Sequence, residues 1–149
     1  MIKKLLALLF FLGSFLMHSQ NSVWRTNTND AIKMSNEQRK PLLIFFTANG
    51  ISKSIQNEVF ATSDFLDWSD KNVVLLKLDL SDVSLSDDEK QQNIRLKEAL
   101  GVEGLPQVCL AKAFIRKNIP RIDKLGMLDY KAGGAKQCIS DATLILRGE

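Results

Sequence analysis

Few side chains in this 149-residue chain are suited to covalent chemistry, and the two cysteines, Cys109 and Cys138, are the foremost of them. A thiol acts as a nucleophile, a disulfide-exchange group or a metal ligand only as its thiolate. The only histidine, His18, lies near the amino terminus. Two cysteines and one histidine are too few for the usual four-ligand zinc site. We therefore expect no bound metal and no cofactor.

Residues 1–19 have the layout of a secretory signal peptide. Two early lysines precede the apolar run Leu5–Met17, and the small residue Ser19 follows at a cleavage position. A retained membrane anchor is the competing interpretation, but a span needs roughly 20 apolar residues. We expect export to the periplasm or the outside of the cell, and a mature chain of residues 20–149 without a stable membrane span.

Cleavage changes both the charge and the available chemistry of the chain. The whole sequence has 20 basic and 17 acidic residues. Residues 1–19 hold two of the basic residues and none of the acidic ones, so the mature chain has 18 against 17, a net charge of +1. The basic residues are scattered singly, so the charge gives no reason to expect an acidic membrane as partner, and we expect no nucleic acid. Loss of His18 excludes Ser-His-Asp and Cys-His nucleophiles.

The pattern of apolar residues predicts alternating strands and helices. Leu42–Phe46 is a short run of aromatic and branched residues, typical of a strand buried on both faces. Ser52 can cap the next helix, and Ser86 with Glu89 fits a capping box. The other expected features are strands at Val73–Leu80, Val108–Ala111 and Arg121–Leu128, a turn at Lys117-Asn118, a helix capped by Thr28 or Asn29, a short helix that opens at Ser63-Asp64, and a last helix after Gly133-Gly134. This order indicates an α/β sandwich.

Several of these segments, in the same order, resemble the thioredoxin-like family. The matching features are Trp24 before a first helix, Lys40-Pro41 before a buried strand, Glu58-Val59-Phe60, the strand Val73–Asp79, the loop Gly101–Pro106 with the pattern G-V-x-G-[IL]-P, and Gly126, Tyr130 and Gly133-Gly134-Ala135 near the end. The resemblance implies a three-layer sandwich, with a central mixed sheet of four to five strands flanked by helices. It implies one such domain over residues 20–149.

The turn that carries the chemistry of this family is altered in the present chain. Members of the family place the redox pair W-C-x-x-C there, where a thiol at a helix start has a lowered pKa. This chain has Asn49-Gly50-Ile51-Ser52, with Ser52 standing where the second thiol would be. A serine hydroxyl cannot exchange disulfides, so the redox activity of the family does not carry over.

A second feature of the family, a peptide-docking platform, has its counterpart at Leu105-Pro106. Family members offer the backbone of the residue before a cis-proline to an extended substrate chain, and that residue is Leu105 here. Two interpretations remain open: Leu105 and Pro106 dock a peptide, or Pro106 only shapes its loop. The docking surface would include Asn49, Gly50, Ile51 and Ser52.

The two cysteines also allow three interpretations. Cys109 and Cys138 are two buried thiols, a structural disulfide between strand and helix, or a redox-active pair. Neither lies at a helix start or beside an evident cationic neighbour, which counts against the redox pair. Strand alternation does not tell which face Cys109 occupies.

Together these patterns lead to one functional hypothesis and two alternatives. The leading hypothesis is an exported, redox-inactive thioredoxin-fold protein that binds a peptide or protein partner in a chaperone-like or assembly role. One alternative is a thiol-disulfide oxidoreductase that uses Cys109 or Cys138. The other is a structural subunit of an envelope assembly.

Overall fold

The computed structural model of the chain describes residues 23–129 and 133–149. The predicted signal peptide, residues 1–19, and Tyr130 lie outside these residues. The elements are, in order, α2 (Thr28–Gln38), β1 (Leu42–Thr47), α3 (Lys53–Ile55), the π-helical segment η1 (Gln56–Phe60), α4 (Ser63–Asn72), β2 (Val74–Asp79), α5 (Asp87–Ala99), β3 (Gln107–Arg116), β4 (Ile119–Leu128) and α6 (Gly134–Arg147). Strands and helices alternate as the sequence predicts.

The four strands form one mixed sheet in the order β2-β1-β3-β4. β1 runs parallel to β2 and antiparallel to β3, and β3 pairs antiparallel with β4. Outside β2, Arg25 adds a one-residue parallel bridge to Leu76. The predicted α/β class and the mixed sheet of four to five strands are therefore confirmed.

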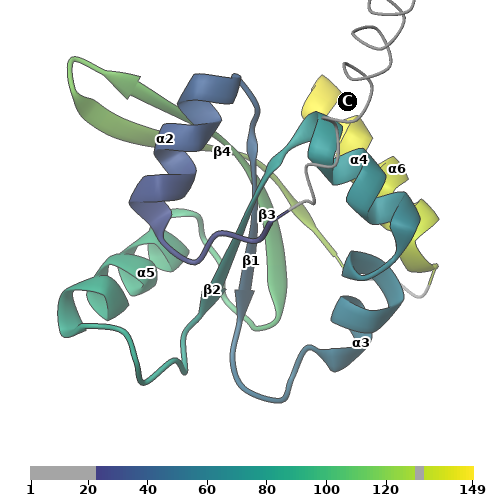
Figure 1. The fold of residues 1–149 in the computed structure, drawn as a ribbon, viewed down its shortest axis with the longest axis horizontal. Coiled ribbons are helices and arrows are strands. Elements are labelled where there is room, and N and C mark those ends of the chain that lie inside the picture. Colours follow the sequence, from purple (N-terminus) through teal and green to yellow (C-terminus); the bar gives the residue numbers. More distant parts are fainter. Residues whose placement is uncertain (1–22, 130–132) are drawn as a thin grey trace, which may run out of the picture.

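Helices cover both faces of the sheet, which makes three layers (Figure 1). On one face, α2 and α5 pack over alternate strand residues that include Ile44, Leu76 and Cys109. On the other face, α3, η1, α4 and α6 pack over the intervening residues, such as Phe45 and Leu110. All six residues of β1 are buried, because the strand is central and covered on both sides.

Side-chain caps fix several helix starts close to the predicted ones. The capping box of Ser86 and Glu89 is present at the start of α5. The cap of the first helix is Asn27, one residue before the predicted caps Thr28 or Asn29, and its side chain accepts a hydrogen bond from the Asp30 N–H at 3.1 Å. Likewise Thr62 caps α4 through the N–H of Phe65, at 3.3 Å. In both helices the observed cap is the residue directly before the predicted one.

The hairpin of β3 and β4 is longer than the sequence predicts. The predicted end of the third strand at Ala111 was wrong, since β3 continues to Arg116, and β4 begins at Ile119. The turn at Lys117-Asn118 is confirmed, with φ values of 51° and 62°. Two successive positive φ angles are those of the type I′ turn, which matches the twist of paired strands. The hydrogen-bonded pairing of β3 with β4 thus continues past the part of the sheet that α2 covers, up to the turn.

No helix within the described residues is both long enough and apolar enough to cross a membrane.

Candidate functional site

The turn after β1 begins with a buried group of polar side chains. The Ser52 and Thr47 hydroxyl oxygens lie 2.6 Å apart, and the Gln56 side-chain amide donates to the Ser52 oxygen at 2.9 Å. Ser52 and Thr47 are 5% and 2% exposed. Although Ser52 precedes α3 as predicted, its side chain makes no capping bond. Its hydroxyl instead ties the start of α3 to the end of β1.

The next part of the turn, residues 49–51, is exposed, and a hydrogen bond from its backbone anchors it. The Asn49 N–H donates to the Ser81 hydroxyl at 2.8 Å, and Ser81 donates to Asp79 at 2.5 Å. Gly50 has a φ of +82°, which other residues rarely adopt. The side chain of Ile51 is 49% exposed. The turn therefore presents one aliphatic side chain to solvent on a backbone anchored to the end of β2.

The Leu105–Pro106 loop lies at the same end of the sheet as this turn, where β1 ends and β3 begins. Phe46 pairs with Gln107 across β1 and β3, so the residues just before Gln107 continue alongside the residues just after Phe46. The Leu105–Pro106 peptide bond is cis. Pro106 is exposed and Leu105 is half-buried. Among the described residues, the backbone N–H and C=O of Leu105 have no hydrogen-bond partner. Antiparallel register thus brings the two predicted segments together.

The two cysteines lie on opposite faces of the sheet. Cys109 packs under α2 and α5, whereas Cys138 packs on the other face with α6. Both are free thiols. A disulfide needs Cα atoms within about 7 Å and side chains that point toward each other. Residues on opposite faces of the sheet do not meet this condition, so the interpretation as a bridge has no support in this arrangement.

Burial makes both thiols poor nucleophiles. It raises the pKa of Cys109 to about 11, an effect that the positive charge of Lys124 partly opposes. It also raises the pKa of Cys138 to about 11, and the carboxylate of Asp141 adds to the effect. A reactive cysteine has a lowered pKa and some exposure. Within the described residues, no group of three His, Cys, Asp or Glu side chains could hold a metal ion.

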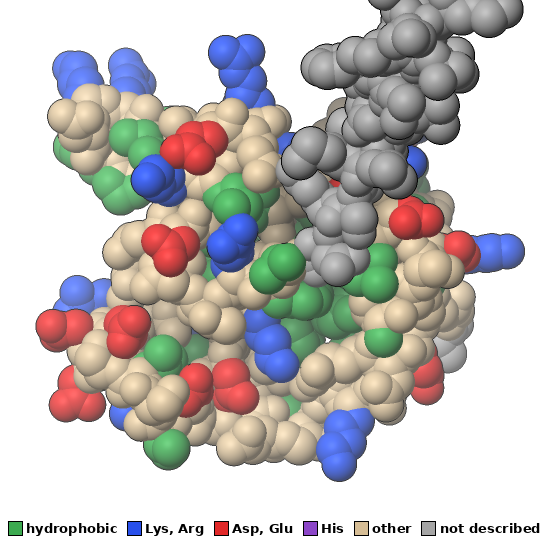
Figure 2. All heavy atoms as spheres, in the orientation of Figure 1, with side chains coloured by type: hydrophobic (Ala, Val, Ile, Leu, Met, Phe, Trp, Pro, Cys, Tyr) green, Lys and Arg blue, Asp and Glu red, His purple; other side chains and the backbone are tan. Residues whose placement is uncertain are grey.

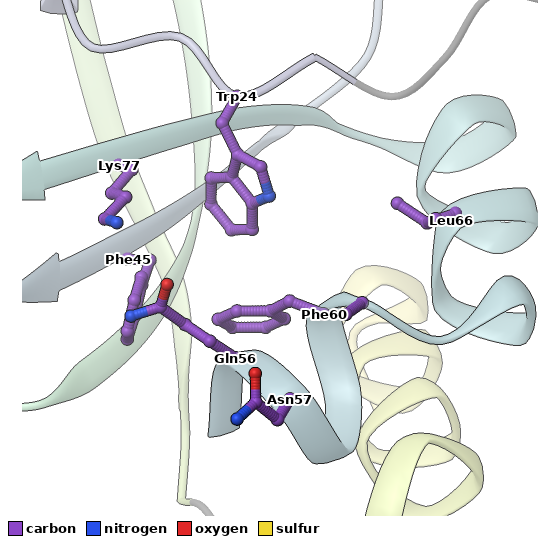
Figure 3. Close-up of a pocket in the computed structure, with 8 residues that line it drawn as sticks. Trp24, Phe45, Gln56, Asn57, Phe60, Leu66 and Lys77 are labelled. Atoms are coloured by element: carbon purple, nitrogen blue, oxygen red, sulfur yellow. The ribbon is translucent and has the colours of Figure 1, made fainter. Parts of the chain in front are cut away.

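An aromatic hollow beside the turn was not predicted from the sequence. It has a volume of about 390 Å³ and opens between η1, α4 and β2 (Figure 3). Its lining comprises Trp24, Phe45, Gln56, Asn57, Phe60, Ala61, Leu66 and Lys77. The Trp24 ring lies 5.0 Å from Phe60 and 6.0 Å from Phe45.

The sequence does carry a signal for this hollow, in Lys77, a charged residue within a mostly apolar strand. Lys77 pairs with Phe45 across β1 and β2 and follows Leu75 on the same side of β2. Gln56 links the hollow to the turn, since its amide also donates to Ser52. The hollow and the turn are thus neighbouring parts of one surface region.

Comparison with solved structures identifies the architecture. The structure of DsbH, described as an oxidoreductase, superimposes with a TM-score of 0.70, covers 89% of each chain and is 19% identical. The chain has a thioredoxin-like fold. A thioredoxin from Thermus thermophilus matches with a TM-score of 0.62 at 11% identity, over 87% of this chain and 91% of that one. No protein-family model matches the sequence, and a search of curated proteins found no match.

These likenesses concern the fold. At 19% and 11% identity they leave activity to be judged from the side chains present. The thioredoxin-like architecture predicted from the sequence is confirmed, whereas the roles of Asn49, Gly50, Ile51, Ser52, Leu105 and Pro106 remain predictions.

Proposed function

We propose that this chain is an exported, redox-inactive thioredoxin-fold protein that binds an extended segment of a peptide or protein partner. The docking surface is formed by residues 49–52 and 104–106, where β1 ends and β3 begins, and the buried Ser52 supports it from beneath. The mature form comprises residues 20–149, as the signal-peptide pattern of the sequence suggests.

One observation supports this proposal above all. The exposed side chain of Ile51 and the unpaired backbone of Leu105 lie at the same end of the sheet. Free backbone N–H and C=O groups in a loop can pair with the backbone of an extended chain, and a neighbouring apolar side chain adds contact area. Ile51 contributes apolar surface directly before Ser52, the residue that stands where the second thiol of the family would be.

The absence of redox activity follows from the groups at the turn and from the state of the two thiols. DsbH is described as an oxidoreductase. Disulfide exchange requires a thiolate that can reach the substrate. Residues 49–52 contain no cysteine, and burial raises the pKa of both Cys109 and Cys138. We therefore expect no catalysis of insulin reduction by dithiothreitol, measured as turbidity.

Binding is tested with a reduced, carboxymethylated unfolded protein as probe. We expect saturable binding by the chain, measured by fluorescence anisotropy. The Ile51→Asp and Leu105→Asp variants should bind at least about tenfold more weakly, because a buried unpaired carboxylate is costly at an interface. Leu144→Asp is the matched control, since Leu144 is an aliphatic residue of similar exposure on α6, 42% against 49% for Ile51.

Thermal unfolding of each variant separates lost binding from lost folding, which matters because Leu105 also packs partly against the core. Equal binding by wild type and by a folded Ile51→Asp variant would refute the proposed surface. Strong insulin reduction by the wild type, abolished in Cys109→Ser or Cys138→Ser, would replace this function by the oxidoreductase alternative.

A further inference from the structure

The outer half of the β3–β4 hairpin projects beyond the helices that cover the sheet (Figure 1). Every residue from 115 to 121 is exposed. Its tip lies at the far end of β3 from Pro106, about 30 Å away for a ten-residue strand. It is therefore a separate surface from the proposed peptide site.

Strand register gathers basic residues on one side of this hairpin. Phe114 pairs with Arg121, and Arg116 pairs with Ile119. Because side chains alternate along a strand, these four residues share a face. We call this the hairpin face, and it comprises Lys112, Phe114, Arg116, Lys117, Ile119 and Arg121. Figure 2 shows blue basic and green apolar side chains together on the projecting hairpin at the upper left.

The charge of the hairpin face is concentrated although the chain as a whole is close to neutral. Four of its six residues are basic, and the acidic residue in register with it is Asp123, opposite Lys112. The basic residues are scattered in the sequence, but the pairing of β3 with β4 brings two separate stretches side by side. A hollow of about 330 Å³ lies among Phe114, Arg116, Lys117, Ile119 and Arg121. Two arginines at a hollow are well suited to a phosphate, which guanidinium groups bind through paired hydrogen bonds.

The hairpin also exposes aliphatic side chains beside these charges. Ile119, on the hairpin face, is 52% exposed, Leu125 is 43% exposed, and Ile115, on the opposite face of the hairpin, is 41% exposed. Arg116 and Lys117 lie between Ile115 and Ile119 in the sequence. Basic residues around exposed aliphatic ones match a lipid interface, where apolar groups enter the acyl boundary and cationic groups reach the headgroups. Binding of single-stranded nucleic acid draws on exposed aromatic residues for stacking, and Phe114, the aromatic residue of this face, is half-buried.

We propose that the hairpin face binds the surface of an anionic phospholipid bilayer. Arg116 and Arg121 bind headgroup phosphates, and Ile119 enters the boundary between headgroups and acyl chains. Binding is peripheral and electrostatic, so it weakens as salt is added. Because this surface is distant from residues 49–52, the protein can hold a peptide while it is bound to a membrane.

The first test is cosedimentation of the full chain with vesicles of phosphatidylglycerol and phosphatidylcholine in equal parts. An Arg116→Gln/Arg121→Gln variant should bind about 30-fold more weakly, since each basic residue near an anionic surface contributes about 1 kcal/mol, a factor of about five. Lys71→Gln/Lys136→Gln removes the same charge from exposed positions on α4 and α6 and should change binding much less. Equal losses in the two double variants would overturn the proposal.

The apolar run Leu5–Met17 can itself bind vesicles. The second test therefore uses a fluorescent label that reports on the hairpin alone. An environment-sensitive bimane label on an Ile119→Cys variant should shift to the blue with anionic vesicles but not with pure phosphatidylcholine. The same label on Val83→Cys, which is 90% exposed in the loop before α5, should not shift. An unshifted label at position 119 would refute the proposal. So would a single-stranded oligonucleotide that binds as tightly as the vesicles and competes with them.

Discussion

The buried hydrogen bonds of Ser52 give a direct test of the structure of the turn. Ser52→Ala removes the bond to the Thr47 hydroxyl at 2.6 Å and the bond from the Gln56 amide at 2.9 Å. Thr47 is 2% exposed, so water cannot replace its lost partner, although its hydroxyl keeps a longer contact of 3.3 Å with the Ala48 carbonyl. Gln56 is half-buried and regains water.

The expected loss follows from these contacts. A buried hydroxyl that loses its partner costs about 1–3 kcal/mol, and the remaining contact to Ala48 favours the lower half of that range. We therefore expect Ser52→Ala to lower the free energy of unfolding by about 1–2 kcal/mol. Ser54→Ala is the control, because Ser54 is exposed on the same short helix. It should change stability by less than about 0.5 kcal/mol.

A double-mutant cycle shows whether the Ser52–Thr47 contact is responsible. In the Thr47→Val/Ser52→Ala variant both hydroxyls are gone, so no buried partner is left unsatisfied, and the combined loss should be about 1 kcal/mol less than the sum of the single losses. Urea unfolding, followed by tryptophan fluorescence, measures all four free energies. Additive losses, or a Ser52→Ala loss no larger than that of Ser54→Ala, would refute this description of the turn.

Two further predictions concern packing and the thiols. Gly126→Ala should lower stability by about 1–3 kcal/mol, because its new Cβ would lie 2.8 Å from a methyl group of Ile145; Gly104→Ala, whose Cβ meets nothing within 4 Å, should be neutral by the same urea unfolding. Cys109 and Cys138 should react with iodoacetamide about a hundredfold more slowly than free cysteine below pH 9, since their pKa values are raised from 9.0 to about 11. Raised pKa values also imply that stability falls as the pH rises from about 9 to 11, because the unfolded thiols ionise first. Rapid labelling at neutral pH, or a disulfide found by intact mass without reductant, would contradict the burial of these thiols.

Local patterns were enough to predict the elements that depend on neighbouring residues. The apolar run Leu42–Phe46 predicts a buried strand, since few other local structures hide five consecutive apolar side chains. The capping box of Ser86 and Glu89 and the turn at Lys117-Asn118 likewise depend on residues a few positions apart. The order of the segments that resemble the thioredoxin-like family was sufficient to predict the fold.

Features that depend on distant partners could not be predicted. Ser52 has the type and position of a helix cap, but its hydroxyl is bound to Thr47, at the end of the preceding strand. The strand of Cys109 has two equally apolar faces, so alternation alone could not place Cys109 and Cys138 on opposite sides of the sheet. Only the register between strands does so.

The basic hairpin shows the same limit at the surface. Beyond Ala111 both faces of β3 are partly exposed, so no apolar alternation indicates that the strand continues. Arg116 and Arg121 are five positions apart in the sequence and are separated by the turn. A net charge near zero therefore concealed a local cluster, which became visible once the pairing of β3 with β4 was known.

The central claim, that residues 49–52 and 104–106 form a docking surface, is tested most directly by backbone-amide NMR. The ¹⁵N-labelled chain would be titrated with the reduced, carboxymethylated unfolded protein. We expect the largest shifts at the amides of Ile51, Gly104 and Leu105, with slower hydrogen exchange at Leu105 as its free N–H gains a partner. Shifts confined to α6 or to the β3–β4 hairpin, or no shifts at saturating probe, would contradict the claim.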